Sequence, residues 1–145
     1  PFGNVEYPLN PIASAIVNGA TYVARGYSGD IRGLTQLITN GINHKGFALI
    51  DVFSPCVTFN LDNTHDFFKQ RIKKLDDVEH NPQDWKAGIE YSMEWGDTIY
   101  TGLFFQTEME TLHGLEPVLA DGVPIAKRPL ALTDEQADRI RNRLR

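Results

Sequence analysis

The single cysteine of this chain, Cys56, is the residue best placed for chemistry. It follows a nearly unbroken apolar run over residues 47–53, bounded by Gly46 and Pro55, which is typical of a strand covered on both faces. Ligands of open α/β sheets collect just beyond the carboxyl ends of the strands, so Cys56 lies where such a fold places its chemistry. Taken alone, the residue types favour a buried inert thiol over a ligand or nucleophile.

Other chemically useful side chains lack the spacing of a self-contained site. Asp30 and Asp51 are better interpreted as a helix cap and a strand-end carboxylate than as an acid/base pair. Arg25, beside Gly26, could hold an anion, and a structural ion pair is at least as well supported. The sequence contains no glycine-rich phosphate loop, nucleophile elbow or His-Glu-x-x-His zinc motif. The histidines show no ligand spacing and are interpreted as surface or cap residues: His44, His65, His80 and His113.

The elements around Cys56 predict a βαβ unit. Asn10 is a favoured N-cap and Pro11 a favoured first helical residue, so a helix begins there. Ser28 or Asp30 caps the helix that crosses between the two strands. In order, we expect a helix over 12–18, a strand over 20–24, a loop over 25–30, a helix over 31–42 and a strand over 47–53.

The chain after Cys56 is more polar and predicts further helices. Asn63 or Thr64 caps a helix whose apolar residues are Phe67, Phe68, Ile72 and Leu75. Thr133 to Gln136 resembles a capping box that opens a last helix. Between them we expect a helix with Trp85, Ile89, Met93 and Trp95 on its apolar side, a buried strand over 100–105 and a tail over 107–128.

Composition limits the classes of function. The chain has 145 residues, of which 41% are hydrophobic and 23% charged, as expected of one soluble globular domain. A net charge of −5 argues against a nucleic-acid partner, and no apolar run approaches the roughly 20 residues of a membrane-spanning helix. One cysteine makes a reducing, cytoplasmic setting the default. Because Pro1 opens a loop-like stretch, we expect the chain to begin part-way through a larger protein.

Several ordered motifs carry a resemblance to a known family. They comprise Asn10-Pro11, the run ATYVARGYSGD at 20–30, the run HKGFALIDVFSPCVTFN at 44–60, Pro82-x-x-Trp85, EWGD at 94–97 and TGLFFQ at 101–106. In this order they closely resemble the β subunit of the 2-oxoacid:ferredoxin oxidoreductases over residues 1–106. The tail from Thr107 is less diagnostic.

The resemblance implies an α/β fold. Residues 1–106 would be the C-terminal half of a thiamine-diphosphate-binding domain, with a mostly parallel sheet flanked by helices. Residues 107–145 would form a C-terminal wrapping tail that ends in a helix. The missing neighbours of the sheet would lie in the N-terminal half of the β subunit or in a partner subunit.

The resemblance also implies cofactors. The family's β subunit binds thiamine pyrophosphate with Mg²⁺ through a Gly-Asp-Gly…Asn motif and holds one [4Fe-4S] cluster with four cysteines. Cys56 matches the fourth cysteine, in the Ser-Pro-Cys segment, and Pro55, Val57 and Phe59 would shield the cluster. The Gly-Asp-Gly motif is not in this sequence, so no thiamine-contacting residue is assigned.

The implied activity is the oxidative decarboxylation of a 2-oxoacid, with coenzyme A taking the acyl group and electrons passing through the cluster to ferredoxin. Implied partners are the α subunit, the N-terminal half of the β subunit and ferredoxin. 2-Oxoglutarate is the expected substrate, with pyruvate or branched-chain 2-oxoacids as alternatives. The alternative from another class is a non-catalytic α/β interaction module in which Cys56 is an ordinary core thiol.

Overall fold

The computed structural model describes residues 5–129 and 131–144, so the loop predicted for residues 1–4 lies outside the described residues. Two compact units divide the chain, one ending at Met109 and the other covering Glu110–Arg145. The strands are β1 (Tyr22–Tyr27), β2 (Ala48–Phe53), β3 (Ile72–Lys74) and β4 (Ile99–Gln106). The helices are α1 (Pro11–Val17), α2 (Ile31–Asn43), α3 (His65–Arg71), α4 (Trp85–Met93), α5 (Leu112–Leu115) and α6 (Asp134–Arg143).

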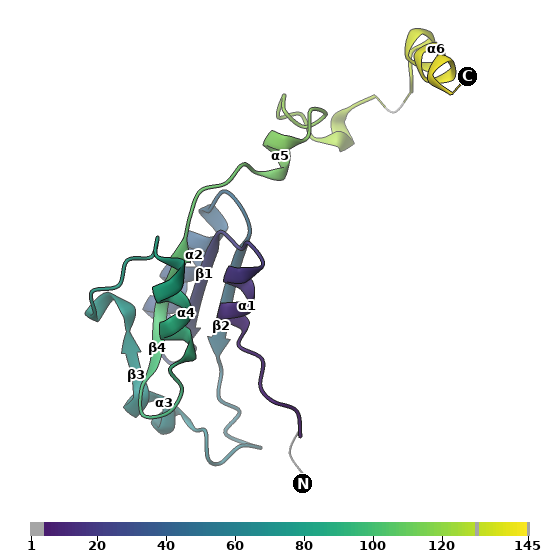
Figure 1. Cartoon of the computed structure of the whole chain (residues 1–145). Coiled ribbons are helices and arrows are strands. Elements are labelled where there is room, and N and C mark those ends of the chain that lie inside the picture. The colour runs from purple at the N-terminus through teal and green to yellow at the C-terminus, as the bar shows by residue number, and fades with distance from the viewer. Residues whose placement is uncertain (1–4, 130, 145) are drawn as a thin grey trace. The chain divides into compact units, whose positions relative to one another are not determined.

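The first unit is built on a four-stranded sheet with the order β2-β1-β4-β3 (Figure 1). β1 pairs in parallel with β2, and β3 pairs in parallel with β4. The central pair, β1 with β4, is antiparallel. The register shifts between Val23, opposite Phe105, and Ala24, opposite Leu103, so Phe104 is the extra residue of β4. Gly102, the partner of Arg25, has φ +125°, a conformation that glycine adopts without a side-chain clash. The predicted α/β fold with a mostly parallel sheet is confirmed.

Helices cover both faces of this sheet. α1 and α4 pack against each other and against β1 and β4 on one face, while α2 packs on the other face (Figure 1). The larger core cluster contains Ile12 and Ile16 of α1 with Val23, Leu75 and Phe104. A smaller cluster of Tyr27, Phe68 and Ile99 fills the end of the sheet near α3.

Two predicted helix starts are confirmed by their caps. The Asn10 side chain accepts a hydrogen bond from the Ala13 N–H at 3.0 Å, with Pro11 as the first helical residue. The Asp30 side chain accepts from the Gly33 N–H at 3.0 Å and begins α2.

The loop predicted over residues 25–30 is wrong in its first half. Arg25, Gly26 and Tyr27 continue β1 and pair with residues 51–53 of β2. All six residues of β1 are buried. β1 has a partner strand on each side, and this pairing keeps Gly26 in the strand although glycine favours turns.

The helix predicted to carry both Phe67 and Leu75 is too long. Thr64 caps α3 as predicted, but the helix ends at Arg71, and Ile72 enters a short parallel ladder opposite Ile99. Leu75 then lies in a 3₁₀ turn with 2% of its surface exposed. Pairing with β4 and burial of Leu75 therefore override the helical spacing of these apolar residues.

The strand predicted over residues 47–53 forms β2 but is only half-buried. β2 is the last strand of the sheet, and no described strand pairs with its outer edge. The half-burial follows from this open edge, because α1 and α2 both contact β2 and so cover its two faces as predicted.

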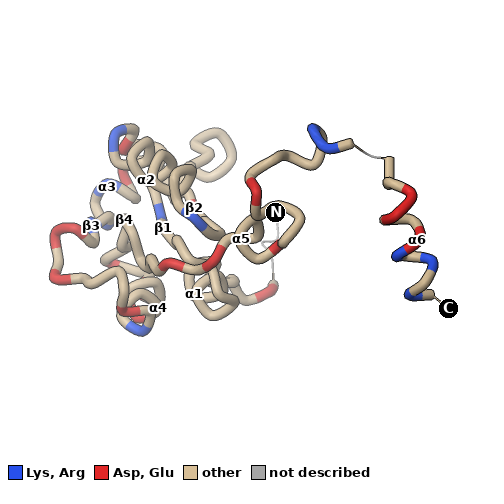
Figure 2. Tube along the Cα trace, turned by 90° about the horizontal axis from the view of Figure 1, so that it is seen from above, with Lys and Arg blue, Asp and Glu red and all other residues tan. Residues whose placement is uncertain are grey.

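The second unit contains short helices without a buried core. No residue between 110 and 144 that the structure describes is buried. The predicted capping box is present: Thr133 and Gln136 bond each other's backbone N–H groups at the start of α6. Acidic residues lie in the first turn of α6 and arginines in the last, as Figure 2 shows, which suits the helix dipole. None of the helices within residues 5–129 and 131–144 combines the length and the apolar composition of a membrane span.

Candidate functional site

Cys56 lies three residues beyond the carboxyl end of β2, in an ordered turn. Its carbonyl oxygen accepts hydrogen bonds from the backbone N–H groups of Phe59, at 3.2 Å, and Asn60, at 2.9 Å. The Asn60 side chain in turn accepts from the N–H groups of Asp62 and Asn63, at 3.1 and 2.9 Å. We call residues 54–64 the Cys56 loop. These backbone contacts give the loop a defined course while the thiol is exposed.

Apolar side chains surround the exposed thiol in sequence. Val57 is 51% exposed, Leu61 78% and Phe59 90%, whereas Pro55 is partly buried. Phe59 and Leu61 on the loop that carries the thiol form an apolar surface of the kind that a partner or another part of a larger protein covers.

Arg25 and Asp51 form a buried ion pair where β1 and β2 approach their carboxyl ends. Arg25 Nε donates to Asp51 Oδ2 at 2.9 Å, and the two side chains are 3% and 22% exposed. The guanidinium lies over the rings of Phe53, Phe104 and Trp95, at 5.0, 5.3 and 6.0 Å from their centroids. Burial lowers the pKa of Arg25, and the hydrogen bond and charge of Asp51 oppose that shift.

The Arg25–Asp51 pair is thus the structural ion pair, one of the two roles that the sequence allows for Arg25. Arg25 Nη1 is buried and has no hydrogen-bond partner in the part of the chain that the structure describes. Arg25, Asp51 and Phe53 line a cavity of about 450 Å³ with the start of α1 and the end of α4. Asp51, predicted as a strand-end carboxylate, lies within β2, two residues before its end, and pairs with Arg25.

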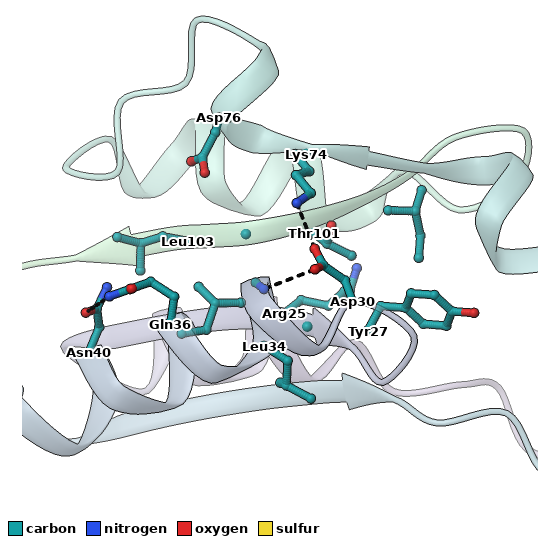
Figure 3. A pocket seen from close by; sticks show the side chains of 15 residues that line it. Arg25, Tyr27, Asp30, Leu34, Gln36, Asn40, Lys74, Asp76, Thr101 and Leu103 are labelled. Atoms are coloured by element: carbon teal, nitrogen blue, oxygen red, sulfur yellow. Dashed lines mark hydrogen bonds and ion pairs between the residues drawn. The ribbon is translucent and has the colours of Figure 1, made fainter. Parts of the chain in front are cut away.

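A second cavity, of about 300 Å³, lies between α2, β3 and β4 (Figure 3). Asp30 and Lys74 point toward each other across it, with Nζ and Oδ2 2.7 Å apart. Asp30 is therefore the predicted cap and also an ion-pair partner. Lys74 and the Gly33 N–H hold the pKa of the Asp30 carboxyl below its ordinary value.

Three histidines bond to groups far away in the sequence. His44 Nε2 lies 2.8 Å from Thr21 Oγ1, and His80 Nε2 lies 2.9 Å from the carbonyl oxygen of Phe104. His65 Nδ1 lies 2.6 Å from the Tyr27 hydroxyl oxygen, and His113 lies in α5. Within residues 5–129 and 131–144, no three His, Cys, Asp or Glu side chains are grouped to hold a metal ion.

Sequence reasoning missed the Tyr27–His65 contact. The interpretation of His65 as a surface or cap residue is incomplete, because its ring also contacts the Tyr27 hydroxyl. No local motif in the sequence joins the two residues. The one available signal is position: Tyr27 precedes the turn after one strand, and His65 follows the cap residue Thr64.

Comparisons with known proteins identify relatives. Residues 56–121 match the family model for the C-terminal part of the pyruvate ferredoxin oxidoreductase beta subunit. A 2-oxoacid:ferredoxin oxidoreductase subunit beta from a Sulfolobus species is 40% identical over 139 residues, which is 86% of this chain and 46% of the relative. The corresponding subunit of Saccharolobus solfataricus is 40% identical over 119 residues, 75% of this chain and 39% of the relative.

A solved structure is also similar. It is the 2-oxoglutarate:ferredoxin oxidoreductase from Magnetococcus marinus with 2-oxoglutarate, coenzyme A and succinyl-CoA bound. The match has a TM-score of 0.77 and 29% identity, and covers 97% of this chain and 47% of that chain. The chain spans about half the length of the curated relatives that it matches. By sequence and by fold, the chain belongs to the family of 2-oxoacid:ferredoxin oxidoreductase β subunits.

Proposed function

We propose that this chain is part of an enzyme that oxidatively decarboxylates a 2-oxoacid, transfers the acyl group to coenzyme A and passes the electrons to ferredoxin. Within it, Cys56 supplies one thiolate ligand of a [4Fe-4S] cluster. Family membership supports the reaction class. The observation that carries the role of Cys56 is an exposed thiol on an ordered turn beyond the carboxyl end of β2.

The residues present fit one ligand position of such a cluster. Four thiolates are the normal ligand set of a [4Fe-4S] cluster, and this chain contains one cysteine. The other three would come from the N-terminal half of the β subunit. An exposed sulfur suits this arrangement because ligands from outside the chain have to reach the same iron atoms. A core thiol, as the interaction-module alternative assumes, would be buried, and Cys56 is exposed.

The surroundings of Cys56 would control access of water. Pro55, Val57 and Phe59 flank the sulfur in sequence, and the half-buried and exposed apolar groups would close over the site in the assembled enzyme. Solvent exclusion and hydrogen bonds near the sulfurs tune the potential of an iron–sulfur centre. When the cofactors are bound, decarboxylation chemistry comes from thiamine pyrophosphate and one-electron transfer from the cluster.

The binding site for thiamine pyrophosphate and Mg²⁺ belongs to other parts of the enzyme. The support is the Gly-Asp-Gly motif, through which the resembling family binds these cofactors and which is not part of this sequence. We assign this site to the N-terminal half of the β subunit, with the α subunit as a further partner. Both are proposals from the family to which the chain belongs.

2-Oxoglutarate is the proposed substrate. The support is the Magnetococcus marinus enzyme, whose structure holds 2-oxoglutarate, coenzyme A and succinyl-CoA. The match covers 97% of this chain and 47% of that chain. The Sulfolobus and Saccharolobus relatives are named only for 2-oxoacids. Pyruvate and branched-chain 2-oxoacids are the alternatives, and relative kcat/KM values for the three substrates distinguish them.

The test of Cys56 is electron paramagnetic resonance of the complete enzyme, purified without oxygen and reduced with dithionite. We expect the wild type to show a [4Fe-4S] signal and to reduce ferredoxin. In Cys56→Ala the signal should be lost or degraded, and ferredoxin reduction should be lost with it. The fold should survive, because a typical point substitution costs on the order of 1 kcal/mol.

Asn60→Ala is the control for damage to the loop. It removes the side-chain bonds to Asp62 and Asn63 and leaves the thiol in place, so the cluster signal should remain. An unchanged signal in Cys56→Ala would place any cluster elsewhere. Absence of a signal in the wild type would favour the interaction module.

A further inference from the structure

The two ends of the Cys56 loop are fastened to two adjacent residues, Ser28 and Tyr27. At the start of the loop, the Ser28 N–H donates to the carbonyl oxygen of Phe53 at 2.9 Å. At its end, the Tyr27 hydroxyl lies 2.6 Å from His65 Nδ1 and 3.3 Å from the His65 carbonyl oxygen. Tyr27 is the last residue of β1 and Ser28 follows it, so one point of the sheet holds both ends of the loop.

The Tyr27 side chain has little freedom to leave this position. It is 6% exposed, and its ring packs against those of His65 and Phe68, with centroids 5.7 and 5.9 Å apart. Its ring also covers Gly29, where an added Cβ would collide with it. Phe68 stacks in turn on Phe53, at 5.1 Å, so the rings join the two ends of the loop.

The Tyr27–His65 contact survives a change of histidine tautomer. With Nδ1 unprotonated, the Tyr27 hydroxyl donates to it. With Nδ1 protonated, the ring N–H donates to the phenol oxygen, and the hydroxyl is free to donate to the His65 carbonyl. Burial and the nearby charge of Asp66 raise the pKa of Tyr27, so the phenol keeps its proton at neutral pH.

We propose that Tyr27 is a positioning residue for Cys56: its hydroxyl, through His65, fixes the far end of the Cys56 loop and so the placement of the thiolate at the cluster. This rests on the proposed role of Cys56 as a cluster ligand. Tyr27 does not touch the reacting atoms in this scheme. It sets how tightly the loop closes over the sulfur, and hence how much water reaches it.

Tyr27→Phe tests this proposal, because it removes the hydroxyl and keeps the ring. Tyr22→Phe is the matched control, since Tyr22 lies on the same strand, is 1% exposed and loses an equivalent bond, from its hydroxyl to the Leu37 carbonyl at 3.0 Å. Leu37 belongs to α2, on the other side of the sheet from α1 and α4. Both variants are made in the complete enzyme complex.

Two quantities are measured in the wild type and both variants. The first is the hydrogen-exchange rate of the backbone amides that form hydrogen bonds within the Cys56 loop. These are the amides of Phe59, Asn60, Asp62 and Asn63. We expect exchange about fivefold faster in Tyr27→Phe, as the loss of one hydrogen bond implies, and unchanged in Tyr22→Phe. The midpoint potential of the cluster should become more positive in Tyr27→Phe alone, because water stabilises the more highly charged reduced form.

The outcomes separate this proposal from the proposed function. Equal exchange in all three proteins would show that Tyr27 does not hold the loop. Faster exchange with an unchanged potential would make Tyr27 a purely structural residue and overturn its positioning role. If the wild-type complex carries no cluster signal, the proposed function fails, and the positioning role fails with it even if loop exchange responds to Tyr27→Phe.

Discussion

At the scale of single residues, the buried Arg25–Asp51 ion pair predicts the largest effect of a substitution on stability. Asp51→Asn preserves the shape of the side chain and removes the charge that compensates a guanidinium only 3% exposed. Leaving a buried charge unpaired costs about 3 kcal/mol or more. We expect the free energy of unfolding to fall by about this amount, measured by urea denaturation followed by circular dichroism.

Glu135→Gln is the comparison for Asp51→Asn. It breaks an ion pair with Arg139 in which both side chains are largely exposed, 85% and 69%. Exposed pairs contribute between zero and about 1 kcal/mol, so this variant should unfold almost as the wild type does. Similar losses in the two variants would mean that the burial of Arg25 carries no special cost.

Residues that act through their neighbours in sequence could be predicted, and residues that act across the fold could not. Asn10 and Thr64 cap helices because each side chain reaches a backbone N–H three residues later. Lys74 reaches Asp30, and Tyr27 reaches His65, only because the sheet brings distant segments together. No spacing in the sequence encodes such contacts. For the same reason, the sequence could not decide between an ion pair and an anion-binding role for Arg25.

At the scale of elements, α4 approaches β4 closely at Gly88. A Cβ on Gly88 would lie 2.5 Å from the backbone oxygen of Phe104, which is fixed in the sheet. We expect Gly88→Ala to lower the free energy of unfolding by about 1–3 kcal/mol, in spite of the better helix propensity of alanine. Gly96→Ala is the control, because nothing lies within 4 Å of its added Cβ. The melting temperatures of both variants are measured by thermal unfolding. Equal melting temperatures for Gly88→Ala and Gly96→Ala would contradict the close approach of α4 to β4.

The elements were predictable where the local sequence pattern was strong. α2 follows its helical apolar periodicity, β2 follows the apolar run over residues 47–53, and α6 begins at the capping box. The error at residues 72–75 has a physical reason: Ile72 and Leu75 fit helical spacing, and their burial against β4 decides for a strand and a turn. The spacing of apolar residues indicates which residues are buried. Whether such a residue then belongs to a helix or to a strand depends on the strand that it pairs with.

At the scale of the whole molecule, the buried core of the described residues lies between Ile12 and Phe104. We therefore expect a chain ended after Met109 to keep the hydrogen-exchange protection of β1 and β4, since the second unit contributes no buried residue among those described. A chain ended after Asp97 is the matched comparison. It lacks β4, the strand that joins β1 to β3, and should lose that protection in β1. Unfolding of the longer chain would contradict the independence of the first unit.

The antiparallel pairing of β1 with β4 also has a consequence for the growing chain on the ribosome. Tyr22 pairs with Gln106, so β1 waits for its second partner until the chain has been synthesised through Gln106. β1 and β2 can pair early, yet one side of β1 stays open during that time. Long-range closure of this kind slows folding and leaves an unpaired strand edge available to other chains. Nascent chains stalled before Ile99 should therefore bind chaperones more strongly than chains released after Gln106.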